Sequence, residues 1–425
     1  MTAVVLFVSF FVLILLSVPI GVALGVSSLF ALLFAGTMPL DFLAQNMVTS
    51  VDSFPIMAVP FFILAGEIMG KGGLSKRLFA VAESVVGNRT GGFAMATIIT
   101  CLLFSAISGS GPATVAAIGG MMIPAMVQMG YDKRFTTALV AAAGALGVIL
   151  PPSIPMIVYG VTAGASVGDL FIAGIIPGIL VTISLMLYAY IYAKRKGYKG
   201  NGEPFSFKKF GAALWDAKWA LLVPIIILGG IYSGYFTPTE AAAVAVIYGL
   251  IAGVVLYREL KIKDLYAILR NSALTTASIL FIIGAATVFG TIMTIEHIPS
   301  QIANAMLSIT ENPILLILII TVLLLIVGCF MDTTAAIIIF TPLLLPVGME
   351  LGYDPIHFGM IIILNLAIGF ITPPIGVNLF VASGISGVSI VSLSKAVLPF
   401  IGVILLTLFI VIFVPEISLF LLGSD

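Results

Sequence analysis

Charged residues are scarce in this 425-residue sequence, at 8% of the chain, whereas a soluble globular domain carries about a quarter. Hydrophobic residues make up 61%. This balance excludes soluble enzymes and disordered scaffolds and predicts a polytopic protein of the lipid bilayer. The eighteen basic residues balance the eighteen acidic ones, so no net charge indicates a nucleic-acid partner.

Cysteine and histidine are nearly absent. Cys101 and Cys329 lie in apolar stretches without a CxxC pair, and His297 and His357 are far apart in the chain. The sequence therefore predicts no transition-metal site. The GxxxGK stretch at 66–71 is one residue too short for a phosphate loop, so no nucleotide site is expected. Without an HExxH or GxSxG motif, we expect no enzyme activity.

Long apolar runs predict the spans of an all-α fold, because a spanning helix needs roughly 20 apolar residues. Seven uninterrupted candidates are present, at 3–35, 53–70, 170–193, 217–236, 238–257, 271–294 and 396–422. Two further stretches, 93–129 and 313–346, are too long for one span and are interrupted by small or polar residues at 108–112 and 331–334. Each predicts a re-entrant helical hairpin.

Two other stretches, 135–165 and 356–388, are each cut by a proline pair, at 151–152 and 373–374. Proline removes a backbone donor, and it disfavours helical geometry in the residue before it. We therefore predict two broken transmembrane helices that unwind at mid-depth.

Nine crossings place all eighteen Lys and Arg residues on one side of the membrane, in the loops 71–92, 130–134, 194–218, 258–270 and 389–395. By the positive-inside rule this side is cytoplasmic. The sequence thus predicts a cytoplasmic N-terminus and a C-terminus on the opposite side of the membrane.

The chain contains an internal duplication. An offset of 222 aligns Gly130-Tyr131-Asp132 with Gly352-Tyr353-Asp354, and it aligns the two proline pairs. We predict a first repeat at 1–193, a cytoplasmic linker with a connecting span at 194–237, and a second repeat at 238–425. An odd number of crossings before the second repeat would invert it. Inverted repeats with discontinuous helices are typical of secondary transporters, whose sites lie at mid-membrane.

The helix breaks are candidate cation sites, because carbonyl oxygens at helix C-terminal ends carry partial negative charge that suits Na⁺. The first predicted Na⁺ site comprises Ser105, Ser108, Gly147, Leu150 and Pro152. The second comprises Gly328, Gly369, Thr372 and Ile375. The alternative, that these glycines only permit close helix packing, stays open.

Asp332 is the acidic residue expected near mid-depth, and a carboxylate there is costly enough to suggest a function. The alternative, a helix N-cap, is equally compatible with its position before an apolar half-helix. Polar neighbours are predicted to bind solute together with Asp332: Thr333, Thr334, Asn378, Ser110, Thr114 and Ser153. Glu67 is expected to form a structural ion pair with Lys71, four residues on.

Several motifs together resemble one transporter family. They are FPIMAVPFF at 54–62, SGSGPAT at 108–114, TPTEA at 237–241 and PPIGVN at 373–378. Over essentially its whole length the chain resembles the large membrane subunit (M subunit) of tripartite ATP-independent periplasmic (TRAP) transporters. The resemblance implies Na⁺-driven uptake of an organic acid, of the sialic acid or C4-dicarboxylate class, by an elevator movement. It also implies two partners, a periplasmic substrate-binding protein and a small four-helix membrane subunit. By the same resemblance the protein lies in the bacterial inner membrane, with its C-terminus in the periplasm.

The family's Na⁺ positions match the two clusters above. In this scheme the hairpins and broken helices would move against a scaffold that includes 3–35 and 217–257.

Two other functions stay open. One is a stand-alone Na⁺-coupled anion symporter without a binding protein, and the other is a passive channel, for which paired re-entrant loops are also suggestive.

Overall fold

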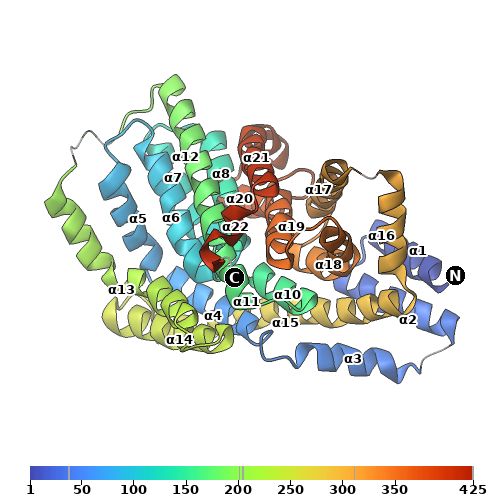
Figure 1. Cartoon of the computed structure of the whole chain (residues 1–425). Coiled ribbons are helices and arrows are strands. Elements are labelled where there is room, and N and C mark those ends of the chain that lie inside the picture. The colour runs from blue at the N-terminus through green and yellow to red at the C-terminus, as the bar shows by residue number, and fades with distance from the viewer. Residues whose placement is uncertain (37–38, 201, 203–204, 311, 424–425) are drawn as a thin grey trace.

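The computed structural model describes residues 1–36, 39–200, 202, 205–310 and 312–423, and within these ranges it contains helices and no strand (Figure 1). The first half of the chain forms α1 (Thr2–Leu15), α2 (Ile20–Ala35), α3 (Asp41–Val51), α4 (Ala58–Lys71), α5 (Leu74–Val86), α6 (Gly92–Ser108), α7 (Gly111–Gln128), α8 (Lys133–Gly144), α9 (Leu146–Ile149), α10 (Ile154–Ala163), α11 (Val167–Ala173) and α12 (Ile175–Lys196).

The second half forms α13 (Phe207–Tyr232), α14 (Pro238–Leu250), the π-helix η1 (Ile251–Leu256), α15 (Ile262–Ile295), α16 (Ile298–Ile309), α17 (Pro313–Phe330), α18 (Thr333–Glu350), α19 (Pro355–Gly369), α20 (Val377–Ser386), α21 (Ile390–Phe413), α22 (Glu416–Leu419) and the 3-10 helix η2 (Phe420–Leu422). Nine helices of the described chain are long and apolar enough to cross a membrane. Three of these, α7, α17 and α18, belong to the two hairpins.

The helices form two groups that meet along one interface. The first helix group contains α1 to α4 and α13 to α15, and the second contains α6 to α12 and α17 to α22. In Figure 1 the long helix α15 runs along the base of the second group. Helices α5 and α16 pack against both groups. Each of these two helices directly precedes a hairpin, so they are placed as connectors between the groups.

The broken helices form the centre of the second group. Nearly every residue of α8, α9 and α19 is buried, which is expected for a helix that is apolar on all sides. Tyr159 on α10 is fully buried against α19, and its hydroxyl donates to the Pro355 carbonyl oxygen at 2.6 Å. A methyl group on Gly359 would lie 2.3 Å from the Tyr159 ring. Glycine at 359 therefore makes room for this contact between the two repeats.

Both predicted hairpins are helix–turn–helix units. The first hairpin joins α6 to α7 through Gly109, which has a left-handed φ of 60°, and Pro112 lies in the first turn of α7. Glycine after a helix end and proline at a helix start both match their backbone preferences. The second hairpin joins α17 to α18 through Met331 and Asp332, both extended.

Both broken helices are also present. The first is interrupted between α9 and α10, at 150–153, and the second between α19 and α20, at 370–376. The bonds between the paired prolines are cis in both. The offset of 222 brings α6 onto α17, α7 onto α18 and α10 onto α20, and it pairs the connectors α5 and α16. Equivalent elements therefore follow one another in the same order in both halves, while the bounds of the two repeats and the inversion of the second stay predictions.

The prediction of one spanning helix at 3–35 is wrong. Two helices, α1 and α2, cover this stretch and pack against each other. The turn between them contains Ser17, with a left-handed φ of 61°, and Pro19, which is the N-cap of α2 and has no backbone N–H to continue the bonding of α1. A folded-back pair places Met1 at the same end as Ala35. The predicted cytoplasmic N-terminus depended on a single crossing and loses that basis.

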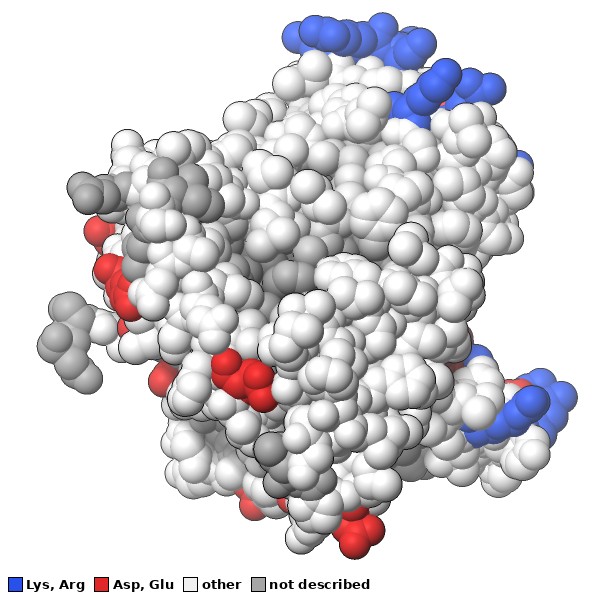
Figure 2. Space-filling model, turned by 90° about the vertical axis from the view of Figure 1, so that its right-hand side faces the viewer, with Lys and Arg blue, Asp and Glu red and all other residues white. Residues whose placement is uncertain are grey.

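Charge is segregated on the surface, as the loop analysis predicted. Figure 2 shows Lys and Arg side chains gathered along the top and lower right edges of one face. The left and bottom edges of the same face show acidic side chains without basic ones. The apolar surface between these edges is the part suited to lipid.

Candidate ion and solute site at the helix breaks

The first hairpin tip lies directly against the first broken helix. A methyl group on Gly147 would be 2.5 Å from the carbonyl oxygen of Ser110 and 2.9 Å from the backbone nitrogen of Gly111. These are backbone atoms, which cannot rotate away as a side chain can. Only glycine at 147 allows this approach, and it brings the tip's main-chain groups to the end of α9.

A hydrogen bond fixes the tip to the break itself. The backbone N–H of Ile154 donates to the Gly109 carbonyl oxygen at 3.2 Å, and a methyl group on Gly109 would lie 2.8 Å from the Pro152 carbonyl oxygen. Leu150, on the other side of the break, is extended. The structure thus brings the predicted residues Gly147 and Pro152 to the first hairpin tip.

The hydroxyl groups at this first site differ in availability. The Ser105 hydroxyl is fully buried and has no hydrogen-bond partner in the described chain, which is rare for a buried polar group. Ser108 and Thr114 bond to each other at 2.9 Å. Ser153 donates to the Val148 carbonyl oxygen at 2.7 Å and caps α10. Ser105 is therefore available to a ligand, whereas Ser153 has a structural role.

The second predicted ion site is assembled differently. A methyl group on Gly369 would lie 2.5 Å from the carbonyl carbon of Gly328, so α17 and α19 touch through backbone just before the second tip. The Thr372 hydroxyl donates to the Ile368 carbonyl oxygen at 2.7 Å, and Ile375 is 41% exposed. The first break is buried at every position, but the second is partly open. The two sites are related by the repeat without being equally enclosed.

Asp332 is half-buried and caps α18. Its Oδ2 accepts a hydrogen bond from the Thr334 backbone nitrogen at 2.9 Å. The cap interpretation is therefore confirmed, and a further role in binding stays a prediction. The neighbouring Thr333 hydroxyl is buried without a hydrogen-bond partner among the residues described, so this tip also holds an unsatisfied polar group.

Asn378 links the second repeat to the first hairpin. Its Nδ2 donates to the Ala141 carbonyl oxygen at 3.1 Å, and its Oδ1 is buried without a partner in the described residues. A methyl group on Gly111 would lie 3.1 Å from that Oδ1. Asn378 therefore joins Ser110 and Thr114 at the first tip, and the predicted solute residues divide between the two tips.

Another buried amide was missed by the sequence reasoning. Asn365, in the middle of α19, donates to the Ile361 carbonyl oxygen at 2.8 Å, and its Oδ1 has no partner in the part of the chain described. The sequence does contain a sign of this residue's importance: Asn365 is an amide within an otherwise apolar stretch. Burying an amide without a hydrogen-bond partner is costly.

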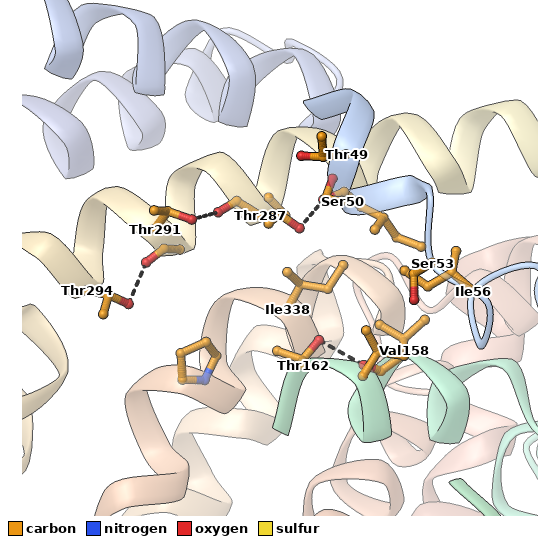
Figure 3. A pocket seen from close by; sticks show the side chains of 15 residues that line it. Thr49, Ser50, Ser53, Ile56, Val158, Thr162, Thr287, Thr291, Thr294 and Ile338 are labelled. Carbon is orange, nitrogen blue, oxygen red and sulfur yellow. Dashed lines mark hydrogen bonds between the residues drawn. The ribbon is translucent and has the colours of Figure 1, made fainter. Parts of the chain in front are cut away.

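Two cavities open along the interface between the helix groups. The threonine cavity has a volume of about 580 Å³ and lies between α3 and α15 on one side and α10 and α18 on the other (Figure 3). Its hydroxyl lining consists of Thr49, Ser50, Ser53, Thr162, Thr287, Thr291 and Thr294. In Figure 3 the hydroxyls of Thr287, Thr291 and Thr162 donate to carbonyl oxygens of their own helices. Their oxygen lone pairs are left for water or solute.

The hairpin cavity, of about 670 Å³, lies between α4 and α15 on one side and the first hairpin tip on the other. Ser108 and Ser110 of the tip line it, as do Glu67, Lys71 and Asn271. Helices α10 and α15 line both cavities. The expected ion pair between Glu67 and Lys71 is wrong, because neither side chain forms one in the described structure. Both line the cavity instead.

Comparison with known proteins decides the family. The model of the tripartite ATP-independent periplasmic transporter, DctM component, matches residues 7–417. The chain belongs to this family. It is 54% identical over 419 residues to the isethionate TRAP transporter permease protein DctMQ of Oleidesulfovibrio alaskensis. This match covers 99% of the chain and 66% of that longer protein.

Other TRAP permeases match over nearly their whole length. The C4-dicarboxylate TRAP transporter large permease protein DctM of Pseudomonas aeruginosa is 41% identical over 397 residues, with 93% of each chain covered. The sialic acid TRAP transporter large permease protein SiaM of Vibrio cholerae is 39% identical over 403 residues, with 95% of this chain and 94% of that one covered. Membership of this family makes the chain the large permease component of a tripartite transporter.

A solved structure shares the fold. The Alcanivorax borkumensis YdaH transporter, described as having an unusual topology, superposes with a TM-score of 0.63 at 15% sequence identity. The match covers 90% of this chain and 88% of that one. At this identity the likeness concerns architecture alone.

Proposed function

We propose that this TRAP large permease carries out Na⁺-coupled uptake of a small organic acid that a periplasmic binding protein delivers. The observation that supports this proposal most is the first break, where Gly147 admits the main chain of the hairpin tip. The buried, unpartnered hydroxyl of Ser105 lies one helical turn before that tip. Oxygen atoms are the donors that hard cations prefer. Ser105 and carbonyl groups of this break supply such donors away from lipid.

The second cation would be held by the backbone around Gly328 and Gly369 with Thr372. Two sites are sufficient energetically. Moving one net charge through 100 mV yields about 2.3 kcal/mol, so two Na⁺ with one monoanion can drive uphill accumulation. ATP is then unnecessary.

The proposed movement is a displacement of the second helix group, with its hairpins and broken helices, relative to the first. The two cavities lie at different levels of the same interface, one beside the N-terminal half of α15 and one beside its C-terminal half. A sliding second group would carry the hairpin tips between them, which is an elevator mechanism. With α1 and α2 counted as two crossings, the same proposal has the N-terminus on the periplasmic side together with the C-terminus.

The solute classes to test are sialic acid, C4-dicarboxylates and isethionate, because relatives are named for each. The chain with its small subunit and a cognate binding protein, reconstituted in proteoliposomes, should accumulate one of these only under an inward Na⁺ gradient. Dissipating the gradient with a Na⁺ ionophore should stop uptake.

Two results would contradict this proposal. Uptake by the large permease alone would indicate a stand-alone symporter. Flux that persists without a Na⁺ gradient and only equilibrates the solute would indicate a passive channel. Empty liposomes and omission of the binding protein are the controls.

A further inference from the structure

The hairpin cavity contains one basic and one acidic side chain among its described lining residues, Lys71 and Glu67. They lie four residues apart on α4, a spacing that normally favours an ion pair, yet neither side chain forms an ion pair or a hydrogen bond with the residues that the structure describes. Both charges are therefore left to interact with whatever enters the cavity.

Other charged side chains on the same side of the molecule do form ion pairs. Arg77, at the start of α5, contacts Glu259 at 2.6 Å and Asp216 at 3.4 Å and lies over the Tyr257 ring at 3.8 Å. A cation at the last residue of α4 does complement the helix dipole. This interaction with the helix dipole accounts for a lysine at 71. It accounts neither for the unpaired carboxylate of Glu67 nor for the position of both side chains in the lining of one cavity.

The cavity also supplies neutral polar groups. Asn271 and Thr275, one turn apart on α15, line it together with the charged pair, and so do Ser108 and Ser110 of the hairpin tip. The side chain of Asn271 makes no hydrogen bond within the described chain. A solute that leaves the tip thus meets a free ammonium, a free carboxylate and a free amide in one space.

We propose that Lys71, Glu67 and Asn271 form a solute subsite that favours a hydroxylated organic monoanion over a dicarboxylate. This rests on the proposed function as an organic-acid transporter. The Lys71 ammonium binds the single carboxylate or sulfonate, and the Glu67 carboxylate accepts a hydrogen bond from a hydroxyl. A second carboxylate on the solute meets Glu67 as a like charge and is repelled. The Asn271 amide contacts either end.

The test measures solute binding to the complex of large and small subunits in nanodiscs with Na⁺ present. Isethionate is the hydroxylated monoanion probe, and succinate is the dicarboxylate probe. Wild type should bind isethionate more tightly than succinate. Because one charge contact near 4 Å in a wet site changes affinity roughly fivefold, Lys71→Gln should weaken isethionate binding by about that factor. Glu67→Gln should tighten succinate binding by about the same factor.

The matched controls are Lys76→Gln and Glu83→Gln on α5, which lie outside the residues lining both cavities. They should leave both affinities unchanged. The subsite is overturned if wild type binds succinate as tightly as isethionate, if it binds neither saturably, or if the α4 variants match the α5 controls. Na⁺-driven uptake by wild type tests the proposed function separately. If wild type transports but the α4 variants keep the wild-type selectivity, only the subsite is refuted.

Discussion

Replacing Gly147 by alanine is expected to reduce Na⁺-driven uptake about tenfold or more, because overpacking against rigid neighbours costs about 1–3 kcal/mol. The added methyl group would meet the Ser110 carbonyl oxygen at 2.5 Å. The hairpin tip must then move away from α9, and the first cation site loses its close main-chain groups. Initial uptake rates in proteoliposomes at several Na⁺ concentrations measure the effect, which should include a higher half-saturating Na⁺ concentration.

Gly120→Ala is the matched control. Gly120 lies on α7 of the same hairpin, and a methyl group there would have nothing within 4 Å. This variant should keep wild-type uptake and Na⁺ dependence. If Gly147→Ala behaves like Gly120→Ala, the tip–break contact is not part of the ion site.

Asp332→Asn is expected to reduce uptake severely, by about tenfold or more, if the half-buried carboxylate serves transport beyond its cap. Asparagine caps a helix about as well as aspartate does, whereas alanine costs about 1 kcal/mol. Asn therefore removes the charge and keeps the bond to the Thr334 nitrogen. Asp332→Ala should be at least as impaired. Thermal stability of each purified variant, measured beside its uptake rate, separates folding from function.

Asp354 provides the comparison for this prediction. It caps α19 in the same way, with Oδ1 accepting from the Ile356 nitrogen at 2.7 Å, but it lies in a loop away from the tips. Asp354→Asn should transport normally. Full activity of Asp332→Asn would reduce Asp332 to a helix cap.

The hairpins and broken helices were predictable because their signals are local. Proline pairs at 151–152 and 373–374 and the glycine-rich tip at 108–112 dictate where a helix must stop, whatever packs around it. The grouping of Gly147 with the first tip followed from placing a cation site where the helix breaks meet. The motifs at 54–62, 108–114, 237–241 and 373–378 were enough to indicate the transporter family, because they too are local in the sequence.

The incorrect predictions concern features that depend on tertiary packing. The stretch 3–35 is apolar throughout, so its length outweighed the single proline at 19, which caps the start of a second helix. The spacing of Glu67 and Lys71 permits an ion pair, but it does not reveal that both residues face a cavity. The contact of Asn378 with Ala141 joins residues 237 positions apart, and no local pattern contains it.

The central claim is that the second helix group moves against the first. It is tested most directly by linking Thr162→Cys on α10 to Thr291→Cys on α15 across the threonine cavity, in a chain whose two native cysteines are replaced by alanine. A cleavable bifunctional thiol reagent makes the link reversible. The control pair, Ser50→Cys and Thr291→Cys, joins α3 to α15 within the first group.

We expect the linked α10–α15 transporter to lose Na⁺-driven uptake and to recover it when the reagent is cleaved, while the α3–α15 link leaves uptake intact. Full uptake by fully linked α10–α15 protein would contradict the account, because solute would then cross without displacement between the two helix groups.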